Sequence, residues 1–155
     1  MKKIIISFFS IFVFFFSCDQ EPYTTVPNTR NLYFKLNLNF LDADLIPQIS
    51  GVKTFTKPRI DGVDFLSPAG IVVINGIGEN LDFNLYAYDL ACPVEAKNDS
   101  LVRIVPNDVG QATCPHCGAT FSLSHGHGNA LSGSKYPLRS YSVVPNGNLQ
   151  YVVRN

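Results

Sequence analysis

Two short cysteine-containing loops constrain this chain more than any other feature of its sequence. Cys92 opens the first loop, and Cys114 and Cys117 lie in the second, and these are all the cysteines after residue 18. Both loops begin with Cys-Pro, and the 21 residues between them include one strand-like run, residues 101–105. Two loops joined through a strand can meet tip to tip. We therefore expect the three thiols to form one shared site.

The rest of the chain predicts short antiparallel strands. Residues 32–40 alternate strictly between apolar and polar side chains, as in a strand with one buried face. Further strand patterns cover residues 52–60, 71–74, 83–88, 119–123, 138–144 and 149–153, and turn residues cluster at 75–80, 106–108 and 145–148. One helical turn is expected within residues 42–48, ended by Pro47. Nothing after the N-terminal apolar run carries three turns of amphipathic helix, so we predict an all-β fold.

The chain begins with the features of an export signal. Two lysines precede a 13-residue apolar run, residues 4–16, which is shorter than the roughly 20 residues of a membrane-spanning helix. Ser17-Cys18 followed by polar residues resembles a bacterial lipoprotein cleavage box, although Phe15 stands where such boxes usually carry leucine. The resemblance implies that residues 1–17 are removed and that lipid on Cys18 anchors the protein in the bacterial cell envelope. A cleaved signal without lipid and a retained membrane anchor are the alternatives.

The composition restricts the possible roles of the chain after the signal. Residues 18–28 are polar, contain two prolines and lack periodicity, which indicates a tether, and residues 29–155 are enough for one domain with its own core. The charges of 12 basic and 12 acidic residues cancel. Because nucleic-acid binding depends on an excess of clustered basic residues, this balance argues against a nucleic-acid partner. No Ser-His-Asp order, phosphate-binding glycine loop or carboxylate pair predicts an enzyme. Lipid on Cys18 would leave three cysteines, and an odd number in an exported protein indicates a free thiol or a metal.

Residues 70–155 resemble the Rieske iron–sulfur domain. The matching segments are residues 71–74, Tyr86-Ala87-Tyr88-Asp89-Leu90-Ala91-Cys92-Pro93, Cys114-Pro115-His116-Cys117-Gly118 with residues 119–123, Gly133, Pro137-Leu138 and Tyr141-Ser142-Val143. The resemblance implies an antiparallel β-sandwich or barrel with a small, rubredoxin-like cysteine-loop subdomain. It also implies a 2Fe–2S cluster and a role in electron transfer. Residues 29–69 show no such match and are expected to add strands to the same sandwich.

The ligand pattern of that family is altered in this chain. Rieske loops supply Cys-x-His and Cys-x-x-His, so that two thiolates hold one iron and two imidazoles hold the other. Cys92 and Cys114 occupy the cysteine positions, but Val94 and Cys117 stand at the two histidine positions. The mixed ligation is therefore impossible as written. The lysine-containing signal also resembles one for the general secretory route, which exports unfolded chains, so a cluster would have to be assembled outside the cytoplasm.

Three interpretations of the thiols remain open. A 2Fe–2S cluster or a zinc ion would need a fourth donor, for which the nearby imidazoles are His116, His125 and His127. The second loop also resembles a zinc knuckle, and Cys92 with one histidine would complete a Cys3His site. A disulfide from Cys92 to Cys114 or Cys117 would instead leave a cofactor-free structural or binding lipoprotein. The candidate metal ligands are Cys92, Cys114 and Cys117, with His116 and His127 as secondary candidates.

Overall fold

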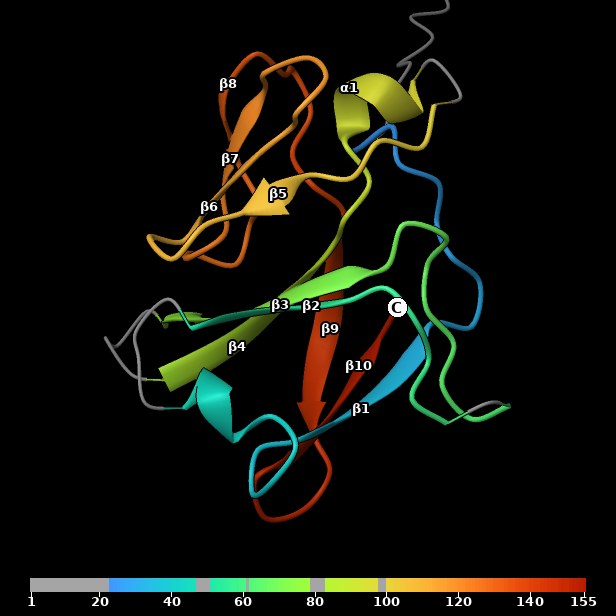
Figure 1. The fold of residues 1–155 in the computed structure, drawn as a ribbon, viewed down its shortest axis with the longest axis vertical. Helices are drawn as coiled ribbons and strands as arrows, with labels where there is room; N and C mark the ends of the chain where they lie inside the picture. Colours follow the sequence, from blue (N-terminus) through green and yellow to red (C-terminus); the bar gives the residue numbers. More distant parts are fainter. Residues whose placement is uncertain (1–22, 47–50, 61, 79–82, 98–99) are drawn as a thin grey trace, which may run out of the picture.

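The computed structural model describes residues 23–46, 51–60, 62–78, 83–97 and 100–155 (Figure 1). The expected signal segment, the candidate lipidation residue Cys18 and the first part of the expected tether lie outside these ranges. Within them, no helix is long and apolar enough to cross a membrane.

Strands dominate the described chain and form two antiparallel sheets. The larger sheet has the order β1-β10-β9-β4-β3-β2, and the smaller one has the order β5-β6-β7-β8. The strands are β1 Tyr33–Asn37, β2 Val52–Phe55, β3 Ile71–Ile77, β4 Phe83–Asp89, β5 Val105–Pro106, β6 Gln111–Thr113, β7 Thr120–Ser122, β8 Ala130–Ser132, β9 Ser140–Pro145 and β10 Gln150–Arg154. The helical elements are a 3-10 turn, Ala43–Leu45, and α1, Pro93–Ala96. The predicted all-β, antiparallel fold is confirmed.

Strand β3 lies between two hydrophobic cores and contributes to both. Ile71, Val72, Val73 and Ile74 are all fully buried, so both faces of this strand are covered. Successive side chains of a strand point to opposite faces. Ile71 and Val73 therefore pack inside the larger sheet, whereas Val72 and Ile74 pack with the core of the smaller one.

The larger sheet curls until its two edge strands approach each other. Phe34 of β1 and Phe55 of β2 lie with ring centroids 4.6 Å apart, although β1 and β2 stand at opposite ends of the strand order. Both rings belong to one buried cluster to which all six strands contribute. Four apolar residues of the alternation at 32–40 lie in this cluster, as expected: Leu32, Phe34, Leu36 and Leu38. Phe40, the last one, is 80% exposed and does not join the core, because β1 ends at Asn37. The sheet is therefore a half-closed barrel around its own core.

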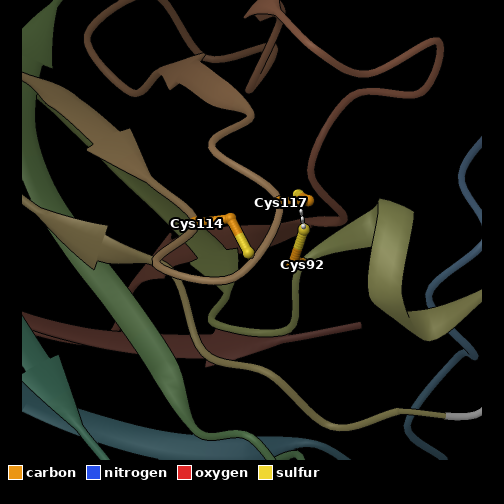
Figure 2. A group of neighbouring side chains, drawn as sticks. All are labelled: Cys92, Cys114 and Cys117. Carbon is orange, nitrogen blue, oxygen red and sulfur yellow. Dashed lines mark hydrogen bonds between the residues drawn. The ribbon is translucent and has the colours of Figure 1, made fainter.

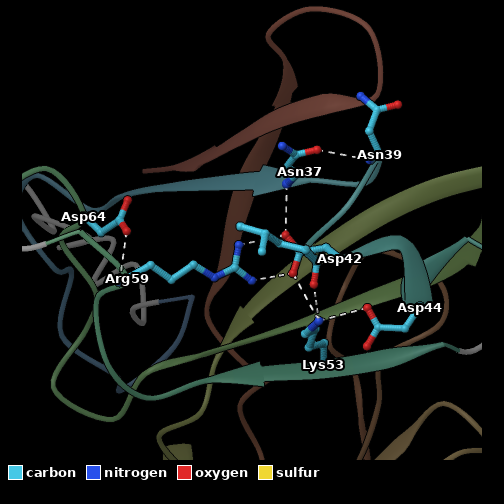
Figure 3. Close-up of polar contacts among 8 residues, drawn as sticks. Asn37, Asn39, Asp42, Asp44, Lys53, Arg59 and Asp64 are labelled. Carbon is cyan, nitrogen blue, oxygen red and sulfur yellow. Dashed lines mark hydrogen bonds and ion pairs between the residues drawn. The ribbon is translucent and has the colours of Figure 1, made fainter.

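A buried carboxylate fixes one end of this half-barrel (Figure 3). Asp42 is fully buried, accepts the Asn37 N–H at 2.9 Å and binds the Arg59 guanidinium through both of its oxygens. The same guanidinium lies over the rings of Phe34 and Phe55, 5.0 and 4.8 Å from their centroids. The loops that follow β1 and β2 are thereby tied to the edge strands.

The small sheet and α1 occupy one end of the molecule, and the β9–β10 turn with the loop after β1 occupies the other (Figure 1). Residues 23–26, which we call the N-terminal strap, lie against the small-sheet end. Val26 is 3% exposed and belongs to the same buried cluster as Cys92 and Cys114. Thr24 is 4% exposed. These residues fall in the segment expected as a tether, yet they are part of the packed domain.

The prediction of a strand at residues 101–105 is wrong. Only Val105 enters a strand, the two-residue β5, and Arg103 forms a single bridge to Ala91. Leu101 and Val105 are exposed, whereas Ile104 is buried and Val102 packs against the core of the small sheet, so the alternation is real but the run pairs with too few residues to form a strand. Its backbone instead bonds to the first cysteine loop, where the Cys92 N–H donates to the Val102 carbonyl at 2.8 Å.

Other boundaries shift without changing the fold. The turn expected at residues 75–80 begins later, because β3 continues to Ile77, and the strand expected at residues 52–60 ends at Phe55. Strands β6 and β8 and helix α1 were not expected. Each has only three or four residues, which is too short to show a periodic pattern.

Candidate metal centre

The first cysteine loop is held by the end of β4. Asp89, its last residue, is buried and accepts the Ala91 N–H at 2.7 Å and the Tyr141 hydroxyl at 2.6 Å. Cys92 follows as the residue before α1, and Pro93 occupies the first helical position, where its missing N–H costs nothing. Cys92 is fully buried. The loop therefore presents its sulfur toward the second loop from a fixed backbone.

The second loop is a tight turn between β6 and β7. The Gly118 N–H donates to the Cys114 carbonyl at 3.0 Å, and the Cys114 N–H donates to the Ala119 carbonyl at 2.8 Å. Gly118 has φ +73°, in the left-handed region that glycine enters without strain. The turn buries Cys114 and leaves Cys117 exposed at its tip.

The two loops bring all three sulfurs together (Figure 2). Their Sγ atoms lie within 4.8 Å of one another, and Cys92 Sγ is 3.7 Å from Cys117 Sγ. The thiols therefore form one group, as the sequence predicts. All three are free thiols at this geometry.

The three thiols differ in acidity. Burial raises the pKa of Cys92 to about 12, and burial also raises the pKa of Cys117. Burial acts in the same direction on Cys114, but the backbone N–H groups of Cys117 and His116 outweigh it and bring the pKa of Cys114 below its ordinary value. Cys114 is thus the thiol that ionises most readily.

Backbone N–H groups also favour the thiolate at the other two sulfurs. The N–H groups of Glu95 and Val94 lower the pKa of Cys92 against the larger effect of burial, and the Ala119 N–H does the same for Cys117. Clusters of peptide N–H groups favour bound negative charge. The N–H groups thus offset part of the effect of burial at Cys92 and Cys117, and they exceed it only at Cys114.

The histidines do not join the thiol group. His116 Nδ1 lies 2.9 Å from Glu95 Oε1, and its side chain is 71% exposed. The hydrogen bond to Glu95 and the charge of that carboxylate raise the pKa of His116. His125 and His127 are exposed on the loop after β7. Among the described residues, the group of close ligand atoms contains the three sulfurs and no imidazole or carboxylate.

Glu95 was missed by the sequence analysis. It is buried although charged, and its ion pair with His116 links the first loop to the second. The signal available for it was a single acidic residue three positions after Cys92, which is common at the start of helices. Only the structure shows that it faces the other loop.

The ligation of a Rieske cluster does not fit these residues. Val94, at the first histidine position, is partly buried and packs against the core of the small sheet, and it has no donor atom. Cys117, at the second, offers a thiol in place of an imidazole. The donors that are present are three sulfurs close enough to share one ion.

Comparisons with known proteins give a limited result. No family model and no curated protein match the chain. Among solved structures, it is similar to a ferredoxin of Sphingomonas yanoikuyae B1, with 12% identity and a TM-score of 0.42 over 70% of this chain and 88% of the other. It is also similar to the ferredoxin of carbazole 1,9a-dioxygenase from Nocardioides aromaticivorans IC177, with 18% identity and a TM-score of 0.43 over 78% of this chain and 97% of the other. Whatever these two ferredoxins bind is a property of those proteins and is not assigned to this chain.

Proposed function

We propose that this protein binds one soft metal ion through the thiolates of Cys92, Cys114 and Cys117. The observation that carries the proposal is that the three sulfurs, contributed by two loops, lie within 4.8 Å of one another. Zinc lies about 2.3 Å from a thiolate sulfur, which places tetrahedral ligands about 3.8 Å apart. Cys92 Sγ and Cys117 Sγ are 3.7 Å apart. Thiolates select zinc, monovalent copper or iron–sulfur centres.

A single ion suits the loops better than a 2Fe–2S cluster. A cluster divides its ligands between two irons, and its Rieske form needs imidazoles where this chain has Val94 and Cys117. A single ion held by Cys92, Cys114 and Cys117 would cross-link the two loops and would favour the thiolate form of all three side chains. Three thiolates would leave a tetrahedral ion one ligand short, and water or a donor from a partner would supply the fourth.

The proposal includes a lipid anchor in the bacterial cell envelope. It is supported by the apolar run at residues 4–16 and by Ser17-Cys18, which resembles a lipoprotein cleavage box. Lipid on Cys18 leaves three thiols, which is the number gathered at the centre. The partner is then the membrane through its lipid, together with a protein that delivers or receives the metal.

Metal analysis of full-length protein, purified without air from its native membranes, tests the metal site. We expect one metal ion per chain, no acid-labile sulfide, and loss of most of the metal in Cys117→Ser, whose side chain is exposed and tolerates substitution. His127→Ala is the matched control, because this exposed residue lies outside the thiol group, and it should keep its metal. Two irons with two labile sulfides per chain would overturn the single-ion proposal.

A second candidate function is a cofactor-free scaffold with a Cys92–Cys117 disulfide. The 3.7 Å between these sulfurs favours this pair, since a shift of less than 2 Å would bring them to the disulfide length of about 2.0 Å. The two thiols would lose two electrons and two protons to an envelope dithiol oxidase. Absence of metal, with Cys114 as the one thiol that reacts with iodoacetamide in the denatured domain, would establish this function.

A further inference from the structure

We infer that the end of the molecule carrying the three thiols faces the membrane surface and lies against the lipid headgroup layer. The inference rests on the lipid anchor at Cys18 of the proposed function, and it adds an orientation that the anchor alone does not give. The orientation depends on where the N-terminal strap is fixed and on how little chain separates it from Cys18.

The strap is bound to the first cysteine loop and to the loop after β7 of the small sheet. The Tyr23 hydroxyl donates to the His127 carbonyl, at 3.1 Å, in the loop after β7. The Thr25 hydroxyl donates to the Pro93 carbonyl, which directly follows Cys92 in the first cysteine loop. The strap therefore leaves the domain at its thiol-bearing end.

The strap is also packed, so it does not act as a loose linker. Thr24 and Val26 are buried, and Val26 shares a hydrophobic cluster with Cys92 and Cys114. Arg139 Nε donates to the Val26 carbonyl at 2.8 Å. Peeling the strap away would expose Val26 and leave these polar groups without partners.

The length of chain between the lipid and the strap then decides the orientation. Cys18 and Tyr23 are five residues apart, and five residues span at most about 18 Å when fully extended. A compact domain of this length has a radius of gyration near 14 Å and is roughly 35 Å across. The connection is therefore shorter than the domain is wide, and the far end of the domain cannot turn to the membrane.

The orientation limits how a partner reaches the metal site. The exposed Cys117 lies 3.7 Å from Cys92, the residue before α1, and therefore at the same end as the strap. In the inferred orientation it faces the layer of water beside the headgroups. A protein that exchanges metal with it must therefore act at the membrane surface. The turn between β9 and β10 and the loop after β1, at the opposite end, point away from the bilayer.

Tryptophan fluorescence tests the orientation directly, because the chain contains no tryptophan. Leu131→Trp places the probe on β8 at the thiol-bearing end, where the side chain is 51% exposed. Phe40→Trp is the matched probe at the far end, in the loop after β1, where the side chain is 80% exposed. Both variants are prepared as full-length lipoprotein in vesicles of phosphatidylcholine with a fraction of lipid carrying a nitroxide on its headgroup.

We expect headgroup nitroxide to quench Leu131→Trp at least threefold more than Phe40→Trp. Equal quenching, or stronger quenching of Phe40→Trp, with protein that floats with the vesicles, would overturn the orientation and leave the anchor intact. Protein that does not float would overturn the anchor and the orientation with it.

A longer connection supplies a second test. Insertion of ten Gly-Ser residues between Glu21 and Pro22 leaves the described domain unchanged but adds enough chain for the domain to turn. The difference in quenching between the two probes should then shrink by at least half. A difference that stays at its original size would overturn the argument from chain length.

Discussion

At the scale of single residues, Asp89 is the polar group on which the first cysteine loop depends. Its oxygens accept the Ala91 N–H and the Tyr141 hydroxyl, so the carboxyl joins the residue before Cys92 to β9. Burial raises the pKa of Asp89, and the hydrogen bonds from Tyr141 and Ala91 act against burial. A buried carboxyl without these donors would be expensive to keep charged.

The substitution Tyr141→Phe removes one of these donors. We expect the free energy of unfolding to fall by about 1.5–3 kcal/mol, the usual range for a hydrogen bond to a charged group. We also expect the pKa of Asp89 to rise further, because the lost hydrogen bond favours the carboxylate. Urea unfolding measures the first effect, and carbon NMR of the Asp89 carboxyl measures the second.

Tyr86→Phe is the control for that experiment. The Tyr86 hydroxyl donates to the Ile77 carbonyl at 3.0 Å, a neutral acceptor in a partly buried position. Its loss should cost about 0.5–1.5 kcal/mol and leave the Asp89 pKa in place. Equal losses of unfolding free energy in Tyr141→Phe and Tyr86→Phe would show that the charge of Asp89 does not strengthen the hydrogen bond from Tyr141.

The sequence predicts that the three thiols lie together, but it does not predict which residues surround them. Cys114 and Cys117 are three residues apart in one turn, so local spacing alone places them together. Cys92 joins them because the two loops meet, which the matching Cys-Pro openings indicate. The pairing of His116 with Glu95 depends on the orientation of α1, and no local pattern records that orientation.

At the scale of elements, the buried Asp42 holds the edge strands of the half-barrel. It binds Arg59 and lies 3.2 Å from Lys53 Nζ. Burial acts to raise the pKa of Asp42, but the Arg59 guanidinium, the Asn37 N–H and Lys53 outweigh it, and the pKa lies below its ordinary value of 3.8. These cations belong to β2 and to the loop after it, so the carboxylate links the region after β1 to the opposite edge.

The substitution Asp42→Asn leaves two cations without their buried partner. We expect a loss of about 3–5 kcal/mol at pH 7, as when one member of a buried ion pair is removed. Because the folded-state pKa lies below the unfolded one, the stabilisation by Asp42 is present above pH 3.8 and is lost as the pH falls through the folded-state value. The gap between wild type and variant should therefore narrow in acid, as measured by urea unfolding from pH 7 to pH 2.

Asp44→Asn provides the matched control for the ion-pair network. Asp44 also pairs with Lys53, at 2.9 Å, but its side chain is 63% exposed. Exposed pairs contribute about 0–1 kcal/mol. A loss at Asp44 as large as that at Asp42 would show that burial does not decide the strength of this network.

Strands with an alternating or continuous apolar run were predicted, whereas the three-residue strands β6 and β8 were not. The alternation at residues 32–40 places Leu32, Phe34, Leu36 and Leu38 in the core, as observed. Strand β6 offers only Ala112 to the core, so its pattern is too short to detect. Residues 56–60 were expected to continue a strand, but they form the loop containing Arg59, whose position depends on the distant Asp42.

At the scale of the whole molecule, the two sheets meet where β3 passes the turn after β7. The Ile77 N–H donates to the Ser124 carbonyl at 3.0 Å. Gly76, one residue earlier, lies so close that an added Cβ would be 2.6 Å from the Tyr86 ring and against the Ser124 carbonyl. The apolar run at residues 71–74 predicts a strand, but it does not predict this backbone contact.

The substitution Gly76→Ala tests whether this contact joins the sheets. Its backbone conformation suits alanine, so the expected loss of about 1–3 kcal/mol comes from the methyl group forced against Ser124 and Tyr86. Ser142→Ala, at an exposed position of β9 in the same sheet, should change the stability by less than about 0.5 kcal/mol. Both are measured by urea unfolding. If Gly76→Ala unfolds at the wild-type urea concentration, the sheets do not approach at Gly76 as closely as the structure places them, and the thiol-bearing end is held by its other contacts, such as the hydrogen bonds from Ile104 to Leu90 and from Cys92 to Val102.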